Sequence, residues 1–422
     1  MIAVFRNSWA LFLGMFFLMV GNGVQGTLLG LRGTLENFST LQMSIVMSAY
    51  FAGFLGGSRL APEMIRRVGH VRVFAALGSL VSAVLILYPV LVNPWAWTLG
   101  RVLIGFCLSG VYVTAESWLN NSVTNELRGK ALSAYMVVQL GGIVAAQYLL
   151  LLGDVSGFVL FIVPSILVSL SFAPILLSVT PTPAFDRTKP MSIRQLIQTS
   201  PLACTGMFLL GGVFAAQFGM VAVYGGLQGF SVPQISVFAS AFYISALLLQ
   251  YPIGYLSDRM DRRRLIIGCS ALGALGALIA FLGATRYEFN LVGAVVVGGL
   301  SNPLYALLIA YANDYLEHED MPAASAGFVF INGLGAVAGP IGIGWVMSLG
   351  GPAFFWAVIG TLMAALAVYG VYRMTRRPVT PGEEDRTPYA PVLASASPVA
   401  VEAAQEYYIE TELSDGDEET SS

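Results

Sequence analysis

Charged residues are scarce in this chain of 422 residues, because Asp, Glu, Lys and Arg together make up only 11% of it. Soluble domains carry about 25%. Hydrophobic residues make up 56%, and the mean hydropathy is +0.74. So few charges could not cover the surface that a soluble protein of this size exposes to water. The composition therefore excludes a soluble enzyme and predicts an integral membrane protein that has the lipid bilayer as a partner.

Residues that carry enzyme chemistry are equally rare. The three cysteines lie far apart within apolar runs, only two histidines occur, and no spacing matches a disulfide framework or a metal site. Neither an H-E-x-x-H pattern nor a nucleotide-binding Gly-rich loop is found. We therefore expect no enzyme activity, no catalytic residue, no metal, no cofactor and no nucleic-acid partner.

Long apolar runs are what the chain has instead. A helix needs about 20 apolar residues to cross the hydrocarbon core, whereas the strands of a membrane barrel alternate apolar and polar residues. The runs here are unbroken, so we predict an all-α membrane protein with twelve transmembrane helices. They cover about 9–31, 41–59, 71–92, 95–117, 131–152, 157–179, 201–227, 234–256, 264–284, 289–312, 323–348 and 352–373.

Basic residues define the orientation of these helices. With a cytoplasmic N-terminus, 18 of the 21 Lys and Arg residues fall on the cytoplasmic side; Arg32 and Arg286 lie outside and Arg101 lies within a span. The positive-inside rule therefore predicts a multi-pass protein of the cell membrane, taken as a bacterial inner membrane, with both termini cytoplasmic.

The sequence contains an internal repeat, which appears when the chain is aligned with itself at an offset of 192 residues. Residues 131–146 then match 323–338 at 6 of 16 positions, and Gln25 falls on Gln217. Parallel repeats of six helices are known from one large class of transporters. Beyond the repeats the chain is rich in Pro, Ser and acids, which predicts disorder. The expected organisation is an N-terminal six-helix bundle at 1–179, a cytoplasmic connector at 180–200, a C-terminal six-helix bundle at 201–373 and a disordered acidic cytoplasmic tail at 374–422.

One cytoplasmic loop carries a recognisable signature. The segment from Gly254 to Arg264, Gly-Tyr-Leu-Ser-Asp-Arg-Met-Asp-Arg-Arg-Arg, resembles the loop motif G-x-L-a-D-r-x-G-r-r of the major facilitator superfamily. An Asp can accept hydrogen bonds at a helix N-terminus, and arginines can pair with acids across a gate. The alternative is a merely basic cytoplasmic loop. We expect gating roles for Asp258, Arg259, Arg262 and Arg263.

The corresponding loop of the first half keeps little of this pattern. At the offset of 192, only Arg67 and Gly69 are retained, with Arg72 beyond them, and Arg66 stands where the acid is expected. We assign Arg67 and Gly69 to the gate as well, and we expect the two halves to gate asymmetrically.

A charge within a membrane span marks a second site. Arg101, Gly105 and Gly110 form a pattern R-x-x-x-G-x-x-x-x-G that looks like another superfamily signature. A charge within a span is costly and usually functional, although an arginine near a helix end can also extend toward the interface. The resemblance implies that Arg101 faces a central cavity and binds an anionic group or perturbs a proton-carrying acid.

Two acids lie near the cytoplasmic ends of spans, Glu116 and Asp314. Glu116 could carry a proton, because burial raises the pKa of a carboxyl. The rival interpretation makes both acids gate partners of the loop arginines, and this is the one that we favour.

Neutral polar residues within the spans complete the expected cavity. Amides in a bilayer need partners, so they should face the interior of the bundle. Packing between helices is the alternative role. The candidates are Asn22, Gln25, Gln139, Gln217, Asn302 and Asn332, together with Tyr112 and Tyr243.

These motifs resemble the major facilitator superfamily over residues 5–373, and the segments 115–119 and 304–314 resemble its bacterial YcaD-like clade. The resemblance implies a monomeric secondary transporter that moves a small solute by alternating access. Arg101 indicates an anionic or partly anionic solute, while proton coupling and the direction of transport are left open. The alternative is a non-transporting membrane scaffold or sensor whose acidic tail binds a partner, because a fold does not decide function.

Overall fold

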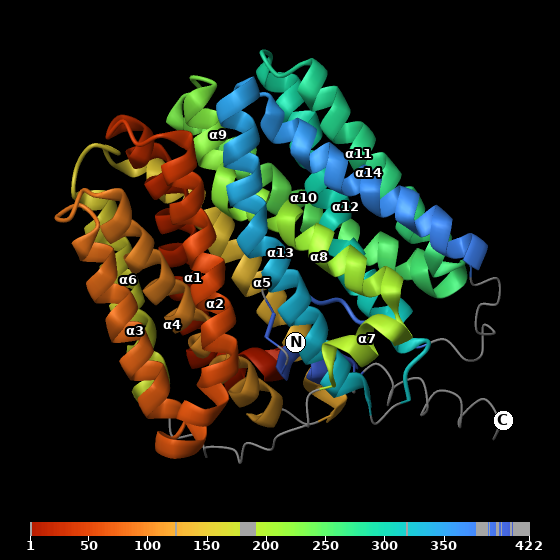
Figure 1. The fold of residues 1–422 in the computed structure, drawn as a ribbon. Helices are drawn as coiled ribbons and strands as arrows, with labels where there is room; N and C mark the ends of the chain where they lie inside the picture. Colours follow the sequence, from red (N-terminus) through yellow and green to blue (C-terminus); the bar gives the residue numbers. More distant parts are fainter. Residues whose placement is uncertain are drawn as a thin grey trace.

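All regular structure in the described part of the chain is helical, and the long helices run side by side (Figure 1). The structure is a computed structural model. It describes residues 2–122, 125–177, 191–317, 320–376, 387, 389–393, 396–397, 399–405 and 407.

Six long helices make up the first half, which is coloured red to yellow in Figure 1. The chain leaves it through a connector that contains the short helix α7 (Ile193–Thr199). The six are α1 (Ile2–Leu35), α2 (Thr40–Val68), α3 (His70–Leu87), α4 (Pro94–Ser122), α5 (Asn125–Leu149) and α6 (Val159–Leu177), with a 3₁₀ turn η1 at Leu150–Leu152.

The second half repeats this arrangement with one interruption. Its first span consists of α8 (Pro201–Ala215), a π-helical turn η2 (Ala216–Met220) and α9 (Val221–Leu227). The other helices are α10 (Val232–Arg259), α11 (Arg262–Leu282), α12 (Tyr287–Asn313), α13 (Met321–Gly350) and α14 (Phe354–Arg376).

Each predicted span coincides with a helix or with a continuous helical series. Ten helices of the described residues are long and apolar enough to cross a membrane. The other two are α2, which carries charges near its end, and α6, whose apolar part Val159–Pro174 is shorter. The all-helical membrane fold is confirmed, whereas the number of twelve crossings stays a prediction.

The repeat is visible in how equivalent helices begin. Ser39 and Gln42 form a capping box at the start of α2, and Ser231 and Gln234 form the same box at the start of α10. Such boxes satisfy backbone N–H groups that a helix leaves unpaired. These residues are 192 positions apart, so the sequence offset corresponds to a structural repeat.

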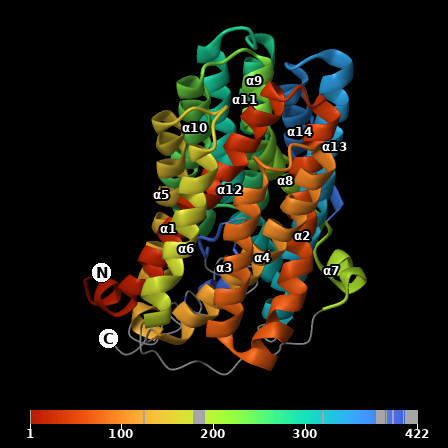
Figure 2. The same ribbon diagram turned by 90° about the vertical axis from the view of Figure 1, so that its left-hand side faces the viewer.

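The packing of the helices follows the same symmetry. In the first half α2 packs on α4, α1 on α5 and α3 on α6; in the second, α10 packs on α12, α8 on α13 and α11 on α14. The halves meet where α2 contacts α13 and α5 contacts α10. Figure 2 shows the helices along a common long axis with α7 near one end of the bundle, which we name the α7 end.

Part of the tail for which disorder is predicted belongs to the residues that the structure describes. Residues 399–405 are helical, and Tyr389, Leu393 and Val401 are buried. The acids that lower the average hydropathy of 374–422 surround a short apolar segment, which has enough apolar surface to pack against the bundle.

Candidate functional site

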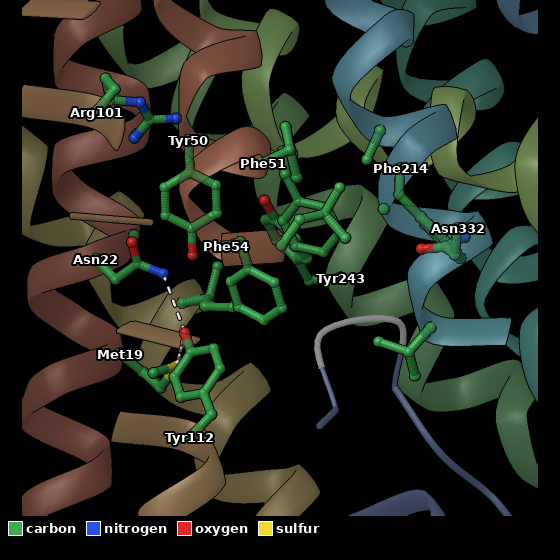
Figure 3. A pocket seen from close by; sticks show the side chains of 18 of the residues that line it. Met19, Asn22, Tyr50, Phe51, Phe54, Arg101, Tyr112, Phe214, Tyr243 and Asn332 are labelled. Atoms are coloured by element: carbon green, nitrogen blue, oxygen red, sulfur yellow. Dashed lines mark hydrogen bonds between the residues drawn. The ribbon is translucent and has the colours of Figure 1, made fainter. Parts of the chain in front are cut away.

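A cavity of about 110 Å³ lies between the two halves (Figure 3). Both halves contribute to its walls, with α1, α2, α4 and α5 on one side and α8, η2, α10 and α13 on the other. Among the residues predicted for a cavity, the structure brings together Arg101, Asn22, Tyr112, Tyr243 and Asn332.

Arg101 is the charged group of this cavity and is only 3% exposed. Its guanidinium donates to Gln25 Oε1 at 2.9 Å and to Met47 Sδ at 3.6 Å, and it lies 4.7 Å from the ring centre of Tyr50. Its Nε has no hydrogen-bond partner. Among the described residues it has no carboxylate partner and none of the lining residues is an acid. A buried guanidinium without a counter-ion is costly, so this wall of the cavity favours an anion.

Seven aromatic residues contribute to the remaining wall. Tyr112 lies 5.9 Å from Phe54 between ring centres, and Tyr243 lies 5.2 Å from Phe218. Asn22 donates to the hydroxyl of Tyr112 at 3.3 Å, which Figure 3 shows as a dashed line. The cavity thus combines apolar contact surface with a few fixed polar groups, as small-molecule sites do.

Four predicted cavity residues lie elsewhere. Gln25 stands behind Arg101 and positions its guanidinium. Gln217 donates to Ser301 Oγ at 2.8 Å and links η2 to α12. Gln139 lies nearer the α7 end, beside the tail, and Asn302 is buried without lining the cavity. Amides in a helix bundle also serve as links between helices, and this alternative fits Gln217.

The halves are in close contact at the end opposite α7. A Cβ added at Gly30 of α1 would come within 2.7 Å of the Ala222 Cβ of α9. Ser48 of α2 donates to the carbonyl of Val337 on α13 at 2.6 Å. Helix backbones therefore meet here, and the cavity is closed on this side.

Charged residues of the second half form a cluster at the α7 end. The guanidinium of Arg262 pairs with Asp314 and lies 3.4 Å from Asp258 Oδ1. It also donates to Ser257 Oγ at 3.1 Å and to the carbonyl of Ala310 at 3.2 Å. The Arg262 side chain is 2% exposed. This cluster ties α10, α11 and the end of α12 together.

The other arginines of the loop motif make local contacts. Arg259 lies over the ring of Tyr255, 3.6 Å from its centre. Arg263 pairs with Asp261 at 3.0 Å, and the Asp261 side chain accepts from the backbone of Arg263 and caps α11. Asp261 therefore begins a helix at the position where the motif has a glycine.

The first half lacks a buried ion pair at the same place among the described residues. Glu63 pairs with Arg66 at 2.7 Å and Arg67 at 2.8 Å, all three on α2 and near water. Gly69 has a φ of 86° in the turn between α2 and α3, a conformation that side chains disfavour. The gate residues predicted here lie on a tight turn and an exposed helix end.

Glu116 has partners other than those expected. It is buried, accepts from the hydroxyl of Tyr135 at 3.2 Å and from the backbone N–H of Ser397 at 2.9 Å, and meets no arginine among the described residues. Asp314 pairs with a loop arginine, and Glu116 pairs with none in the part of the chain that the structure describes.

Comparison with known proteins decides the family. A family model described as Major Facilitator Superfamily matches residues 11–232 and 202–406. The chain belongs to the major facilitator superfamily. It is therefore a multi-pass membrane protein of a transporter family, as the loop motifs predicted.

Relatives and solved structures of this superfamily agree with that assignment. The "Uncharacterized MFS-type transporter YcaD" of Salmonella newport (strain SL254) is 26% identical over 339 residues, which are 79% of this chain and 87% of the relative. The predicted resemblance to YcaD-like transporters is thereby confirmed. The nucleoside transporter NupG has a TM-score of 0.71 at 14% identity, over 86% of this chain and 98% of that chain. A D-xylose–proton symporter has a TM-score of 0.65 at 14% identity, over 86% and 95%. Likeness at this identity shows the fold alone.

Several cavity residues of this superfamily member were missed from the sequence. The offset of 192 would have found two of them, because Phe51 is related to Tyr243 and Phe214 to Asn22, and all four line the cavity. Tyr50 carries no such signal. It faces the cavity because α2 packs on α4, which places its ring beneath Arg101.

Proposed function

We propose that this superfamily member is a secondary transporter that carries a small anionic solute across the cytoplasmic membrane by alternating access. The observation that supports it best is Arg101, a buried guanidinium that has no carboxylate partner among the described residues and lies in a cavity between the two halves. Such a site can be exposed to either side when two repeats rock about it.

An anionic solute is favoured by the donors that Arg101 leaves unused. A carboxylate or phosphate oxygen accepts readily from a guanidinium, and these bonds are stronger than those between neutral groups. The aromatic rings would contact the apolar part of the solute. A cavity of about 110 Å³ is smaller than the roughly 300–1,000 Å³ of drug-sized sites, which favours a small solute.

The orientation in the membrane is proposed from the basic residues. Helix ends at the α7 end carry Arg66, Arg67, Arg262, Arg263 and Arg264, whereas Arg32 and Arg286 lie at the opposite end. By the positive-inside rule the α7 end faces the cytoplasm. The cavity is then closed toward the outside.

Proton coupling would involve Glu116. Its carboxyl is buried on α4, one helical turn from Tyr112 of the cavity wall, and its described neighbours are neutral groups. A carboxyl in such surroundings can gain and lose a proton during a transport cycle.

Flux in proteoliposomes tests the proposal. Purified protein is first screened for thermal stabilisation by short-chain carboxylates, sugar phosphates, neutral sugars and nucleosides, and stabilising compounds are then used as radiolabelled solutes. We expect uptake of an anionic compound by the parent protein and a loss of at least about tenfold in Arg101→Gln, the scale of one charge-assisted contact.

The matched control is Arg286→Gln, which removes an exposed arginine outside the cavity and should transport like the parent. Uptake is also measured with and without a proton gradient, and Glu116→Gln should abolish any gradient dependence. Absence of flux for every compound class would contradict transport and support a scaffold. Selective uptake of neutral or cationic solutes would contradict the anionic assignment.

A further inference from the structure

Part of the tail fills the space between the two halves at the α7 end. We name the described residues from 387 to 405 the plug segment. Within it Tyr389, Leu393 and Val401 are between 0 and 6% exposed. In Figure 1 these residues are the dark blue trace and turn below α5 and α13. Burial of this apolar segment is favourable because it removes hydrocarbon from water.

Three carboxylates hold the backbone of the plug segment. Each accepts a backbone N–H, and such bonds to ionised groups are stronger than neutral ones. The acceptors come from both halves, so the segment links them. The bonds run from Thr387 N to Asp314 at 3.0 Å, from Tyr389 N to Asp258 at 3.1 Å and from Ser397 N to Glu116 at 2.9 Å.

Tyr389 binds in a specific site on the second half. Its hydroxyl accepts from Gln250 Nε2 at 3.0 Å and donates to the carbonyl of Pro303 at 3.5 Å. Its ring lies against Gly254, where an added Cβ would come within 2.7 Å of the ring and would have three atoms of this ring as its nearest neighbours. The glycine of the loop motif thus leaves room for a tail side chain.

The plug segment lies between the cavity and the α7 end. Four helices that line the cavity also carry a residue that contacts the tail or lies beside it. On each helix this residue lies one or two turns from the cavity-lining residue, toward the α7 end. One to two turns correspond to about 6–10 Å along the helix axis. The pairs of cavity and tail-facing residues are Tyr112 and Glu116 on α4, Ile143 and Gln139 on α5, Tyr243 and Gln250 on α10, and Val329 and Ser325 on α13.

We infer that the α7 end is a binding site for the chain's own tail, and that the plug segment blocks the path between the cavity and this end. Since the opposite end is closed by helix contacts, the solute cannot leave until the segment moves out. The halves likewise cannot close at the α7 end while the segment lies between them. The consequence for flux rests on the proposed function; the occupancy of the site does not.

Thiol labelling of the full-length chain in lipid nanodiscs tests the occupancy. Val401→Cys is labelled with a charged maleimide and compared with Gln198→Cys on exposed α7. The parent chain sets the background, because Cys107, Cys204 and Cys269 are buried. We expect Val401→Cys to react at least about tenfold more slowly than Gln198→Cys, as for a site that opens only locally. Equal rates would overturn the inference.

A release variant supplies the second measurement. Gly254→Leu places a side chain where the Tyr389 ring lies, so it should displace the segment and raise the labelling rate of Val401→Cys at least about tenfold. Gly268→Leu is the matched control, since an added Cβ at this helical glycine meets nothing within 4 Å. It should leave the rate unchanged. An unchanged rate in Gly254→Leu, with a thermal unfolding midpoint like that of the control, would overturn the inference.

Flux then tests the block separately. With any solute that the parent transports, Gly254→Leu should raise the initial rate several-fold while Gly268→Leu does not, and equal rates in all three proteins would overturn the block. Labelling requires no solute. A protein that transports nothing but shows the expected labelling would therefore contradict the proposed function and still support the bound tail.

Discussion

The two halves share their helix packing but differ in what joins the helices at the α7 end. In the second half Arg262 of α11 pairs with Asp314 beside α12. The residue 192 positions earlier is His70 of α3, whose Nε2 lies 3.2 Å from Ser117 Oγ on α4. One half therefore has a buried ion pair where the other has a contact between an imidazole and a hydroxyl. The same packing of helices can be held by either.

At the α7 end, the described ion pairs of the first half lie within one helix. Arg66 stands at the position equivalent to Asp258, and its partner Glu63 lies on the same helix α2. No described ion pair joins α2 or α3 to another helix. Among the described residues, the buried Asp314 accepts from Arg262 and from Thr387 N, and the exposed Asp258 lies 3.4 Å from Arg262 and accepts from Tyr389 N. The plug segment therefore has its N-terminal contacts on the second half.

Among variants that test the difference between the halves, Arg262→Ala is expected to lower the free energy of unfolding most. It leaves Asp314, whose side chain is 5% exposed, without its guanidinium. Removing one partner of a buried pair typically costs 3–5 kcal/mol, so the free energy of unfolding should fall by about 3–5 kcal/mol. Unfolding of the purified protein in mixed micelles by a denaturing detergent measures this. A loss below about 1 kcal/mol would show that the cluster adds nothing beyond a surface contact.

A smaller loss is expected when both partners become apolar. The double variant Arg262→Met with Asp314→Leu leaves no buried charge unpaired, so it should be more stable than Arg262→Ala by about 1–3 kcal/mol. The single Asp314→Leu variant completes the cycle. Additive losses would contradict coupling between the two side chains.

Ser117→Ala should have a modest effect in the first half. It removes the hydroxyl beside His70, and one neutral hydrogen bond contributes about 0.5–1.5 kcal/mol. The same unfolding assay applies. A loss as large as that of Arg262→Ala would remove the difference between the halves.

The smallest effect is expected at Glu63. Hydrogen bonds from Arg66 and then Arg67 lower the pKa of this carboxyl from 4.5 to about 2. A lowered pKa in the folded state stabilises above the unfolded pKa, and this contribution disappears as the pH falls from about 4.5 to about 2. The exposed pair should matter little, so Glu63→Gln should unfold almost like the parent at pH 7, and any difference should shrink toward low pH and high salt. A difference that grows on acidification would contradict this assignment.

The sequence carries enough information for the helices and little for the tail. Apolar runs and the offset of 192 identify the long helices because helix formation in a membrane depends on local composition, but they do not identify the short helix α7 in the connector. The capping boxes at Ser39 and Ser231 belong to the same repeat. The cavity residues Arg101 and Asn22 could be predicted as polar groups within spans, and their placement in one cavity agrees with that expectation.

The remaining contacts depend on residues far apart in the chain. Composition averaged over 374–422 indicates disorder, yet Tyr389 and Val401 are buried because distant carboxylates and helix surfaces receive them. Tyr50 of the cavity and Ser397 at Glu116 likewise depend on tertiary packing. No local sequence pattern predicts such contacts.

The position of Tyr389 in the chain also determines how tightly the site around Gly254 must bind the Tyr389 side chain. Tyr389 follows Arg376, the last residue of α14, by only 13 positions. A short tether keeps a bound group at an effective concentration on the order of millimolar. A site whose intrinsic dissociation constant is about millimolar would then be occupied by Tyr389 about half of the time. A free molecule that competes for this site must reach a similar concentration. Weak contacts near Gly254 can therefore suffice, and tail length becomes an adjustable control of access to the cavity.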